Sequence, residues 1–233
     1  MNSLFMENRS QPLADRLRPK SISQIVGQDH LLAVTAPIGR MLSQKRVSSM
    51  ILWGPPGCGK TTLARLLCDD SNAEFEQLSA VFSGVTDLRK VFERANRRNE
   101  IGQRTLLFID EIHRLNPAIE EVLYPAMEDF QVDLTIGEGP TARTIKLDLP
   151  PFTLVGATTR TGLLTSPFRD RFGIIQRLEF YGVDDLTSIV QRSADMLNVV
   201  ADQEGAREIA IRSRGTPRIA NRLLRRVRDV ASV

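Results

Sequence analysis

Two short segments constrain the fold of this chain more than any other feature. The first runs Gly-Pro-Pro-Gly-Cys-Gly-Lys-Thr at residues 54–61 and matches the pattern G-x-x-x-x-G-K-[ST]. The second is the apolar run Leu-Leu-Phe-Ile at residues 106–109, which is followed by Asp110 and Glu111. A loop of this pattern cradles phosphate groups, and a buried strand that ends in acids supplies its usual magnesium-binding partner. Both segments in this order indicate a domain that binds ATP and hydrolyses it.

Hydrophobic periodicity predicts strands that alternate with helices. The predicted strands are residues 49–53, 75–78, 105–109, 152–158 and 175–180. The predicted helices are residues 60–70, 87–98, 117–128, 185–196, 202–213 and 218–233. Such alternation favours an α/β fold with a mostly parallel sheet flanked by helices. Because the strands stop near Tyr181, we expect a large ATPase domain at residues 1–181 and a small helical lid domain at 182–233.

One segment does not follow this alternation. Residues 132–136 and 144–149 alternate apolar and polar side chains, and the turn-forming sequence Gly-Glu-Gly-Pro lies between them at 137–140. Alternation with a period of two on either side of a turn predicts a β-hairpin. We therefore expect a hairpin inserted at about residues 131–149.

Composition indicates a soluble cytoplasmic protein without a membrane span. The chain has 233 residues, of which 42% are apolar and 25% charged, values ordinary for a globular protein. Its first ten residues lack the apolar core of a signal peptide. Cys58 lies in the glycine-rich loop and Cys68 in the helix that should follow, so we expect free thiols in a reducing compartment. The net charge is only +3, and the basic stretch at 218–228 is predicted to be a solvated helix face.

The glycine-rich loop supplies the first candidate site residues. Gly54, Gly57 and Gly59 let the backbone turn its N–H groups toward phosphate oxygens, and the helix that follows adds its positive end. We expect Lys60 to reach the β- and γ-phosphates of ATP. We expect the hydroxyl of Thr61 to bind Mg²⁺, with Thr62 next to it.

The acids after the second apolar run supply the catalytic candidates. Asp110 is placed to hold the water shell of Mg²⁺, and Glu111 to orient the attacking water. The alternative is that these acids only cap the next helix. His113 receives no chemical role, because such a histidine is more often structural. Thr158 and Thr159 end a strand where they could contact the γ-phosphate, and Arg169 and Arg171 could equally form surface ion pairs.

Several longer passages resemble RuvB, the bacterial AAA+ motor family that drives Holliday-junction branch migration. They are LLFIDEIHRL from residue 106, EVLYPAMEDF from 121, IGEGP from 136, GATTR from 156, RDRFG from 169 and GTPRIANR from 215. This resemblance runs from about residue 106 to the end. The first hundred residues, with LADRLRPK from 13, SSMILWGPPG from 48 and LSAVFSGV from 78, are more similar to RarA, an AAA+ ATPase of stalled replication forks. The sequence therefore resembles a hybrid of two related families.

The resemblance to RuvB implies roles for further residues. Leu17 and Arg18 should border the adenine, and Thr159 should sense the γ-phosphate. Arg171 should be the arginine finger that enters the neighbouring subunit's site, and Arg218 the second sensor. Further nucleotide-associated positions are Tyr181, Glu128, Asp129 and Phe130, the last of which replaces a common tyrosine. The hairpin at 131–149 should dock a RuvA-like junction-binding protein, although it could instead be an edge hairpin that merely packs.

These resemblances imply an oligomer, expected to be a hexameric ring, that uses ATP and Mg²⁺ and acts on DNA. The first hypothesis is a branch-migration motor for Holliday junctions, and the second is a RarA-like ATPase at stalled forks. A third is a truncated nucleotide-binding module with little activity alone. RuvB continues into a winged-helix domain that contacts DNA, and because the sequence ends at Val233 we expect that domain to be absent.

Overall fold

The structure is a computed structural model that describes residues 12–136 and 143–231. Contacts between Cα atoms divide the chain into two compact units. The unit that we call the sheet unit comprises His30–Gly54 and Leu63–Leu178. The other, which we call the lid unit, comprises Met1–Asp29, Pro55–Thr62 and Glu179–Val233.

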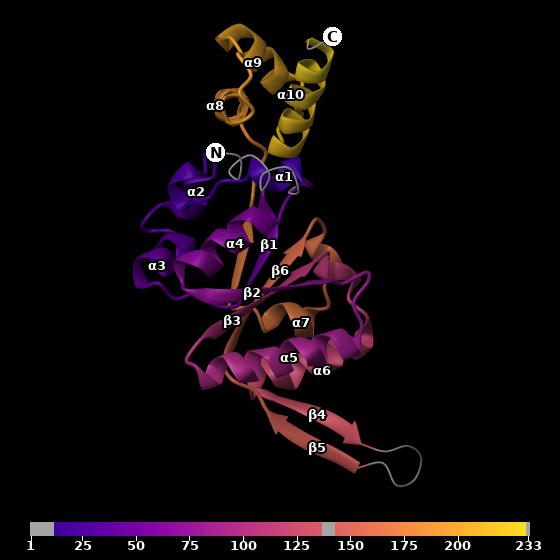
Figure 1. Ribbon diagram of the computed structural model, residues 1–233. Helices are drawn as coiled ribbons and strands as arrows, with labels where there is room; N and C mark the ends of the chain where they lie inside the picture. Colours follow the sequence, from indigo (N-terminus) through magenta and orange to yellow (C-terminus); the bar gives the residue numbers. More distant parts are fainter. Residues whose placement is uncertain (1–11, 137–142, 232–233) are drawn as a thin grey trace, which may run out of the picture. The chain divides into compact units, whose positions relative to one another are not determined.

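The sheet unit is built on a parallel sheet with the strand order β2-β3-β6-β1-β7 (Figure 1). Its strands are β1 (Met50–Trp53), β2 (Ala73–Ser79), β3 (Arg104–Asp110), β6 (Phe152–Thr158) and β7 (Ile174–Arg177). In register, Met50 of β1 lies between Val155 of β6 and Ile174 of β7. The central strands β3 and β6 are buried over five consecutive residues each, as expected for apolar runs covered on both faces. The predicted α/β fold with a parallel sheet flanked by helices is confirmed.

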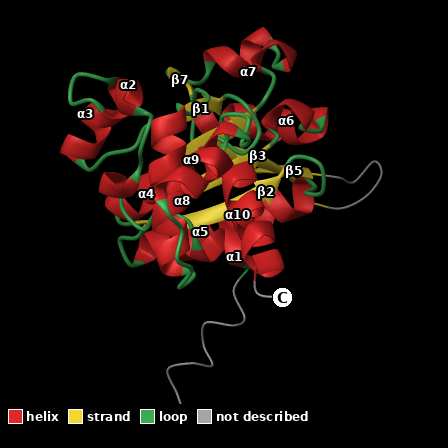
Figure 2. Ribbon diagram, turned by 90° about the horizontal axis from the view of Figure 1, so that it is seen from above, coloured by secondary structure: helices red, strands yellow, loops and turns green. Residues whose placement is uncertain are grey.

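Amphipathic helices flank this sheet. They are α2 (Asp29–Leu32), α3 (Pro37–Gln44), α4 (Lys60–Asp70), α5 (Val85–Glu100), α6 (Pro117–Glu128) and α7 (Ser166–Asp170). In Figure 2, α5 lies beside β2 at one edge of the sheet. The helix α6 begins as its sequence predicts, with Pro117 in its first turn and the Asn116 side chain accepting a hydrogen bond from the Ala118 N–H at 2.9 Å.

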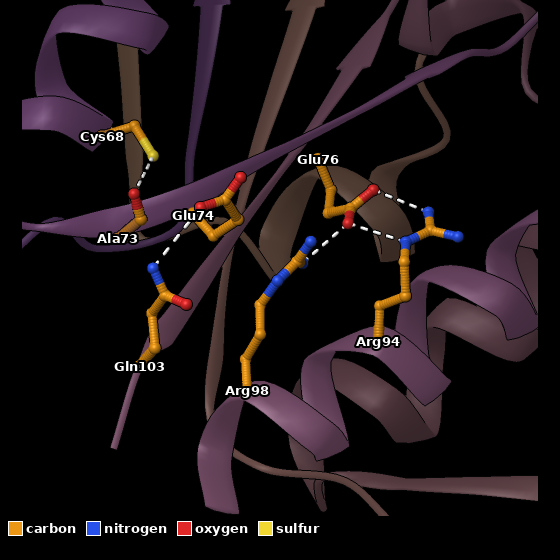
Figure 3. Close-up of polar contacts among 7 residues, drawn as sticks. All are labelled: Cys68, Ala73, Glu74, Glu76, Arg94, Arg98 and Gln103. Atoms are coloured by element: carbon orange, nitrogen blue, oxygen red, sulfur yellow. Dashed lines mark hydrogen bonds and ion pairs between the residues drawn. The ribbon is translucent and has the colours of Figure 1, made fainter. Parts of the chain in front are cut away.

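A cluster of charged side chains fastens α5 to the edge strand β2 (Figure 3). Glu76 of β2 accepts two hydrogen bonds from the guanidinium of Arg94, at 2.8 and 2.7 Å, and Arg98 lies 2.6 Å from the same carboxylate. The hydrogen bonds from Arg94 lower the pKa of Glu76, against the opposing effect of burial. This bidentate pair fixes the side chains of α5 that face β2.

The predicted hairpin is present as a separate two-stranded antiparallel sheet (Figure 1). Its strands are β4 (Gln131–Ile136) and β5 (Arg143–Asp148), and the predicted turn at 137–140 lies outside the described residues. Val132 and Leu149 at its base are 2% and 6% exposed and belong to the core of the sheet unit. The base of the hairpin is therefore anchored in the same core as α5 and α6.

The lid unit has a helical core of its own. Its helices are α1 (Leu13–Arg16), α8 (Val183–Met196), α9 (Gln203–Ile211) and α10 (Pro217–Ala231). Leu186, Val190, Ala206 and Leu224 are almost fully buried where α8, α9 and α10 meet. Residues 232 and 233, predicted to end the last helix, lie outside the described residues. In the described ranges, no helix has the length and apolar character needed to cross a membrane.

The prediction of a strand at 175–180 is wrong at its end, because β7 stops at Arg177. The Leu178 N–H still donates to the Trp53 carbonyl at 2.8 Å, but the backbone of Glu179 pairs with a side chain instead of a strand. Its N–H donates to Gln28 Oε1 and its carbonyl accepts from Gln28 Nε2, both at 3.2 Å. Gln28 is 2% exposed, so a buried amide satisfies these backbone groups where the ladder ends. Other predicted elements differ from the observed ones by a few residues at their ends.

Candidate nucleotide site

The glycine-rich loop leaves the sheet at the end of β1 and leads directly into α4. Gly57 has a φ of 83°, in the left-handed region that favours glycine. A Cβ added at Gly57 would lie 2.8 Å from Cβ of Arg218, so the loop and the start of α10 are in close contact. Gly54 is also constrained, since a Cβ there would lie 2.2 Å from the carbonyl oxygen of Leu178. Glycine is therefore required at both positions because neighbouring atoms leave no room for a Cβ, and at Gly57 also because of the positive φ.

Lys60, the first residue of α4, folds back over the loop. Its Nζ donates to the Pro55 carbonyl at 2.9 Å and lies 3.9 Å from Sγ of Cys58. The Lys60 ammonium is therefore held against the backbone and a side chain of the loop itself. Burial raises the pKa of Cys58, so its thiol stays protonated beside this ammonium. Thr61 and Thr62 follow in the first turn of α4 and are half-buried.

The lid unit brings the loop together with the predicted adenine-side residues. The hydroxyl of Tyr181 donates to the Cys58 carbonyl at 3.0 Å, and burial raises the pKa of Tyr181 to about 12, which keeps it a donor. Leu17 is 2% exposed, and Nη2 of Arg192 lies 3.4 Å from its carbonyl oxygen. Arg18 forms an ion pair with Asp15 at 3.1 Å. Leu17, Arg18, Tyr181 and Arg218 thus share one compact unit with the loop from Pro55 to Thr62.

In the sheet unit, the acids lie where β3 ends. Asp110 is the last residue of β3, and its Oδ1 accepts the N–H of Glu111 at 3.1 Å. Glu111 has a φ of 54°, a left-handed conformation that costs a residue with a side chain about 1–3 kcal/mol. The Glu111 carboxylate makes no capping hydrogen bond to the short helical turn Ile112–Arg114. The alternative interpretation of Glu111 as a helix cap therefore gains no support from the geometry.

His113 received no role from the sequence, and Thr158 received only a possible contact with the γ-phosphate. Thr158, the last residue of β6, is fully buried, and its hydroxyl lies 2.9 Å from Nδ1 of His113. The other ring nitrogen of His113 lies 3.5 Å from Glu111 Oε2. Thr159, the predicted sensor, follows immediately after β6 and is half-buried. The contact between Glu111 and His113 could have been suspected from the sequence, because the two residues are only two positions apart. No sequence signal indicates the contact between His113 and Thr158.

Arg171, the predicted arginine finger, is held by α6. Its Nε lies 2.9 Å from Oε1 of Glu128, and its guanidinium stacks over the ring of Tyr124 at 4.1 Å. Its Nη1 also donates to the Pro167 carbonyl at 2.6 Å. The structure thus pairs two predicted site residues, Arg171 and Glu128, and adds Tyr124, which the sequence analysis missed. Asp129 and Phe130 follow at the end of α6, and the Phe130 ring packs edge-on against Phe152.

Comparisons with family models and solved structures show which proteins this chain is similar to. The family model described as Holliday junction DNA helicase RuvB P-loop domain matches residues 17–178, and that described as RuvB AAA lid domain matches residues 181–233. The solved structure of the Thermotoga maritima RuvB Holliday junction branch migration motor is 42% identical, with a TM-score of 0.76 over 92% of this chain and 66% of its own. A substitution variant of Thermotoga maritima RuvB is 41% identical, with a TM-score of 0.78 over 93% of this chain and 67% of its own.

The match to RuvB extends further toward the N-terminus than the sequence analysis predicted. It starts at residue 17 instead of near residue 106. The stronger likeness of the first hundred residues to RarA stays a prediction. The chain spans about two thirds of the length of the RuvB chains that it matches. Since the two models together match nearly all of the sequence, and the solved structures share its fold at above 40% identity, the chain belongs to the RuvB family of AAA+ P-loop proteins.

Proposed function

We propose that this chain is the ATP-hydrolysing engine of a RuvB-type motor that drives branch migration of Holliday junctions in recombination and repair. The observation that carries the proposal is the lid unit itself. It joins the phosphate loop to Tyr181 through a hydrogen bond and packs the predicted sensor Arg218 against Gly57. A lid residue in contact with the loop can respond to the phosphates that the loop binds, and its movement is the output of a motor of this class.

Each residue has a defined part in the proposed reaction. The N–H groups of the loop and the ammonium of Lys60 bind the phosphates, with Lys60 exchanging the Pro55 carbonyl for phosphate oxygens. The Thr61 hydroxyl and the Asp110 carboxylate are oxygen ligands of the kind that Mg²⁺ prefers, and Mg²⁺ would neutralise phosphate charge there. Glu111 accepts a hydrogen bond from the attacking water, and Thr159 contacts the γ-phosphate.

We propose further that the active form is a ring, hexameric as the family resemblance implies, in which Arg171 completes the site of the neighbouring subunit. An arginine finger supplied in this way raises the rate of hydrolysis about 10³- to 10⁵-fold. ATP turnover per chain should therefore rise steeply with protein concentration, while the Kd for ATP measured on dilute protein stays unchanged. A turnover number that does not change on dilution would contradict a shared site.

The hairpin is the proposed docking site for a RuvA-like junction-binding protein. Asp133 pairs with Lys146 across β4 and β5, so residues 134–145 can be replaced by an Asn-Gly turn while the anchored base is kept. We expect this variant to bind ATP and melt as the unsubstituted chain does, but to lose measurable binding to the junction-bound partner in a titration. Phe82→Ser, which removes an apolar side chain that is 89% exposed elsewhere on the sheet unit, is the matched control. Unchanged partner binding by the shortened hairpin would contradict the docking role.

A further inference from the structure

His113 makes two contacts that join the end of β6 to Glu111. Its Nδ1 lies 2.9 Å from the hydroxyl oxygen of Thr158, and its Nε2 lies 3.5 Å from Oε2 of Glu111. The His113 side chain is 5% exposed, whereas the Glu111 carboxylate is 38% exposed. A buried ring therefore stands between a buried threonine and a half-exposed acid.

The hydrogen bonds of Thr158 favour one position for the proton on this ring. The hydroxyl oxygen of Thr158 already accepts the N–H of Arg160 at 2.9 Å. Its own proton is free to be donated, and Nδ1 of His113 is the nitrogen in place to accept it. A neutral imidazole that accepts at Nδ1 carries its proton on Nε2, the nitrogen that faces Glu111. Burial lowers the pKa of His113, against the opposing effect of the Glu111 carboxylate, which is consistent with a neutral ring.

We propose that His113 is a positioning residue for ATP hydrolysis, which holds the carboxylate of Glu111 through Nε2–H and is itself held by Thr158. This inference rests on the proposed role of Glu111 in orienting water. The distance of 3.5 Å is longer than an ordinary hydrogen bond of about 3.0 Å, as is common before substrate is bound. Among the described residues, the Glu111 carboxylate has no other hydrogen bond or ion pair, so His113 is the group available to fix it.

The arrangement also gives a physical route from the γ-phosphate to the water-orienting acid. Thr159, the predicted γ-phosphate sensor, is the neighbour of Thr158 in the chain. A shift at the end of β6 that brings Thr159 to the phosphate must move the Thr158 hydroxyl as well. Because the ring of His113 follows that hydroxyl, Glu111 would be brought into place only when the γ-phosphate is present.

Two substitutions separate the two ring nitrogens. His113→Asn keeps a polar atom near the position of Nδ1 and removes the group that faces Glu111, whereas His113→Gln can still present an N–H near the position of Nε2. We expect His113→Asn to lower kcat by about 10- to 100-fold, the usual cost of a misplaced catalytic group, with affinity for a non-hydrolysable ATP analogue and melting temperature unchanged. His113→Gln should retain most of the lost turnover. The inference would be overturned if His113→Asn hydrolysed ATP as fast as the unsubstituted chain. It would also be overturned if nucleotide affinity and melting temperature fell together with kcat.

A second measurement does not depend on turnover. The chain contains only two histidines, His30 and His113, so ¹⁵N signals of the ring nitrogens can be assigned by comparison with the His113→Asn variant. At pH 7 we expect His113 to be the Nε2–H tautomer, and a Thr158→Val substitution to abolish that preference. An Nδ1–H tautomer in a chain that hydrolyses ATP would overturn the inference and leave the proposed function intact. Absence of hydrolysis by the unsubstituted chain at every concentration would overturn the proposed function instead.

Discussion

Glu111→Gln is expected to stop ATP turnover while leaving ATP binding intact. The substitution keeps the size of the side chain and its ability to contact water, but a neutral amide is a far weaker acceptor for a water proton. Loss of such a group typically costs about 10²–10⁴ in rate. Because the proposed role of Glu111 is to accept a hydrogen bond from the attacking water and not to hold the phosphates, ATP binding should not require it. Nucleotide affinity by calorimetry and single-turnover hydrolysis measure the two effects separately.

Two further variants define what this result means. Lys60→Ala removes the ammonium that lies over the phosphate loop and is expected to abolish nucleotide binding itself. Glu121→Gln makes the same chemical change at an exposed position on α6 and should leave binding and turnover unchanged. Normal hydrolysis by Glu111→Gln would show that another group orients the water, and would remove the basis for the role of His113 as well.

The parts of the fold that were predicted correctly are those in which local sequence decides the structure. Phe152–Thr158 is observed as predicted, because its run of apolar residues has no other stable place than a buried strand. The buried face of α5, with Leu88, Val91 and Phe92, follows directly from helical spacing. The short helices before residue 45 were missed, because segments such as Asp29–Leu32 are too short to show a period. The predicted end of β7 was wrong, because the backbone of Glu179 bonds to the side-chain amide of Gln28 and not to a neighbouring strand. Gln28 is remote in the sequence, so no local pattern indicates this contact.

The candidate site shows the same division. The phosphate loop and the acids after β3 are visible in the sequence, since each motif is contiguous and its chemistry needs those residue types. The contacts that orient these groups are not contiguous. Thr158 reaches His113 across 45 residues, and the stacking of Arg171 on Tyr124 joins the residue after α7 to α6. No periodicity encodes such pairs, so the structure was needed to find them. The assigned roles of all these residues stay predictions.

Arg171→Ala is expected to lower ATP turnover by about 10³–10⁵, with ATP affinity unchanged, because an arginine finger acts on the charge of the transition state. In the single chain, the guanidinium of Arg171, the proposed finger, is stacked on Tyr124 and lies beside Glu128, both on α6. Arg169→Ala is the matched control. Arg169 lies in the last turn of α7, two residues before Arg171, and is half-buried. Its one ion pair among the described residues is with the neighbouring Asp170 at 4.0 Å, so turnover should not change.

Mixing experiments then decide whether the finger acts on its own chain or on a neighbour. A Lys60→Ala subunit cannot bind ATP but still carries Arg171, and an Arg171→Ala subunit binds ATP but lacks the finger. In a ring with heterologous contacts, random mixing of equal amounts places a subunit with Arg171 beside about half of the subunits with an intact phosphate loop. Two proteins that are inactive alone should therefore hydrolyse ATP together. Glu111→Gln subunits, which should bind ATP, ought to rescue Arg171→Ala in the same way. His113→Asn subunits should not be rescued, because their defect lies in the site that holds the nucleotide. Both assignments would be reversed if mixing rescued His113→Asn but not Arg171→Ala. In that case His113 would act on the site of the neighbouring subunit, and Arg171 would act on the site of its own chain.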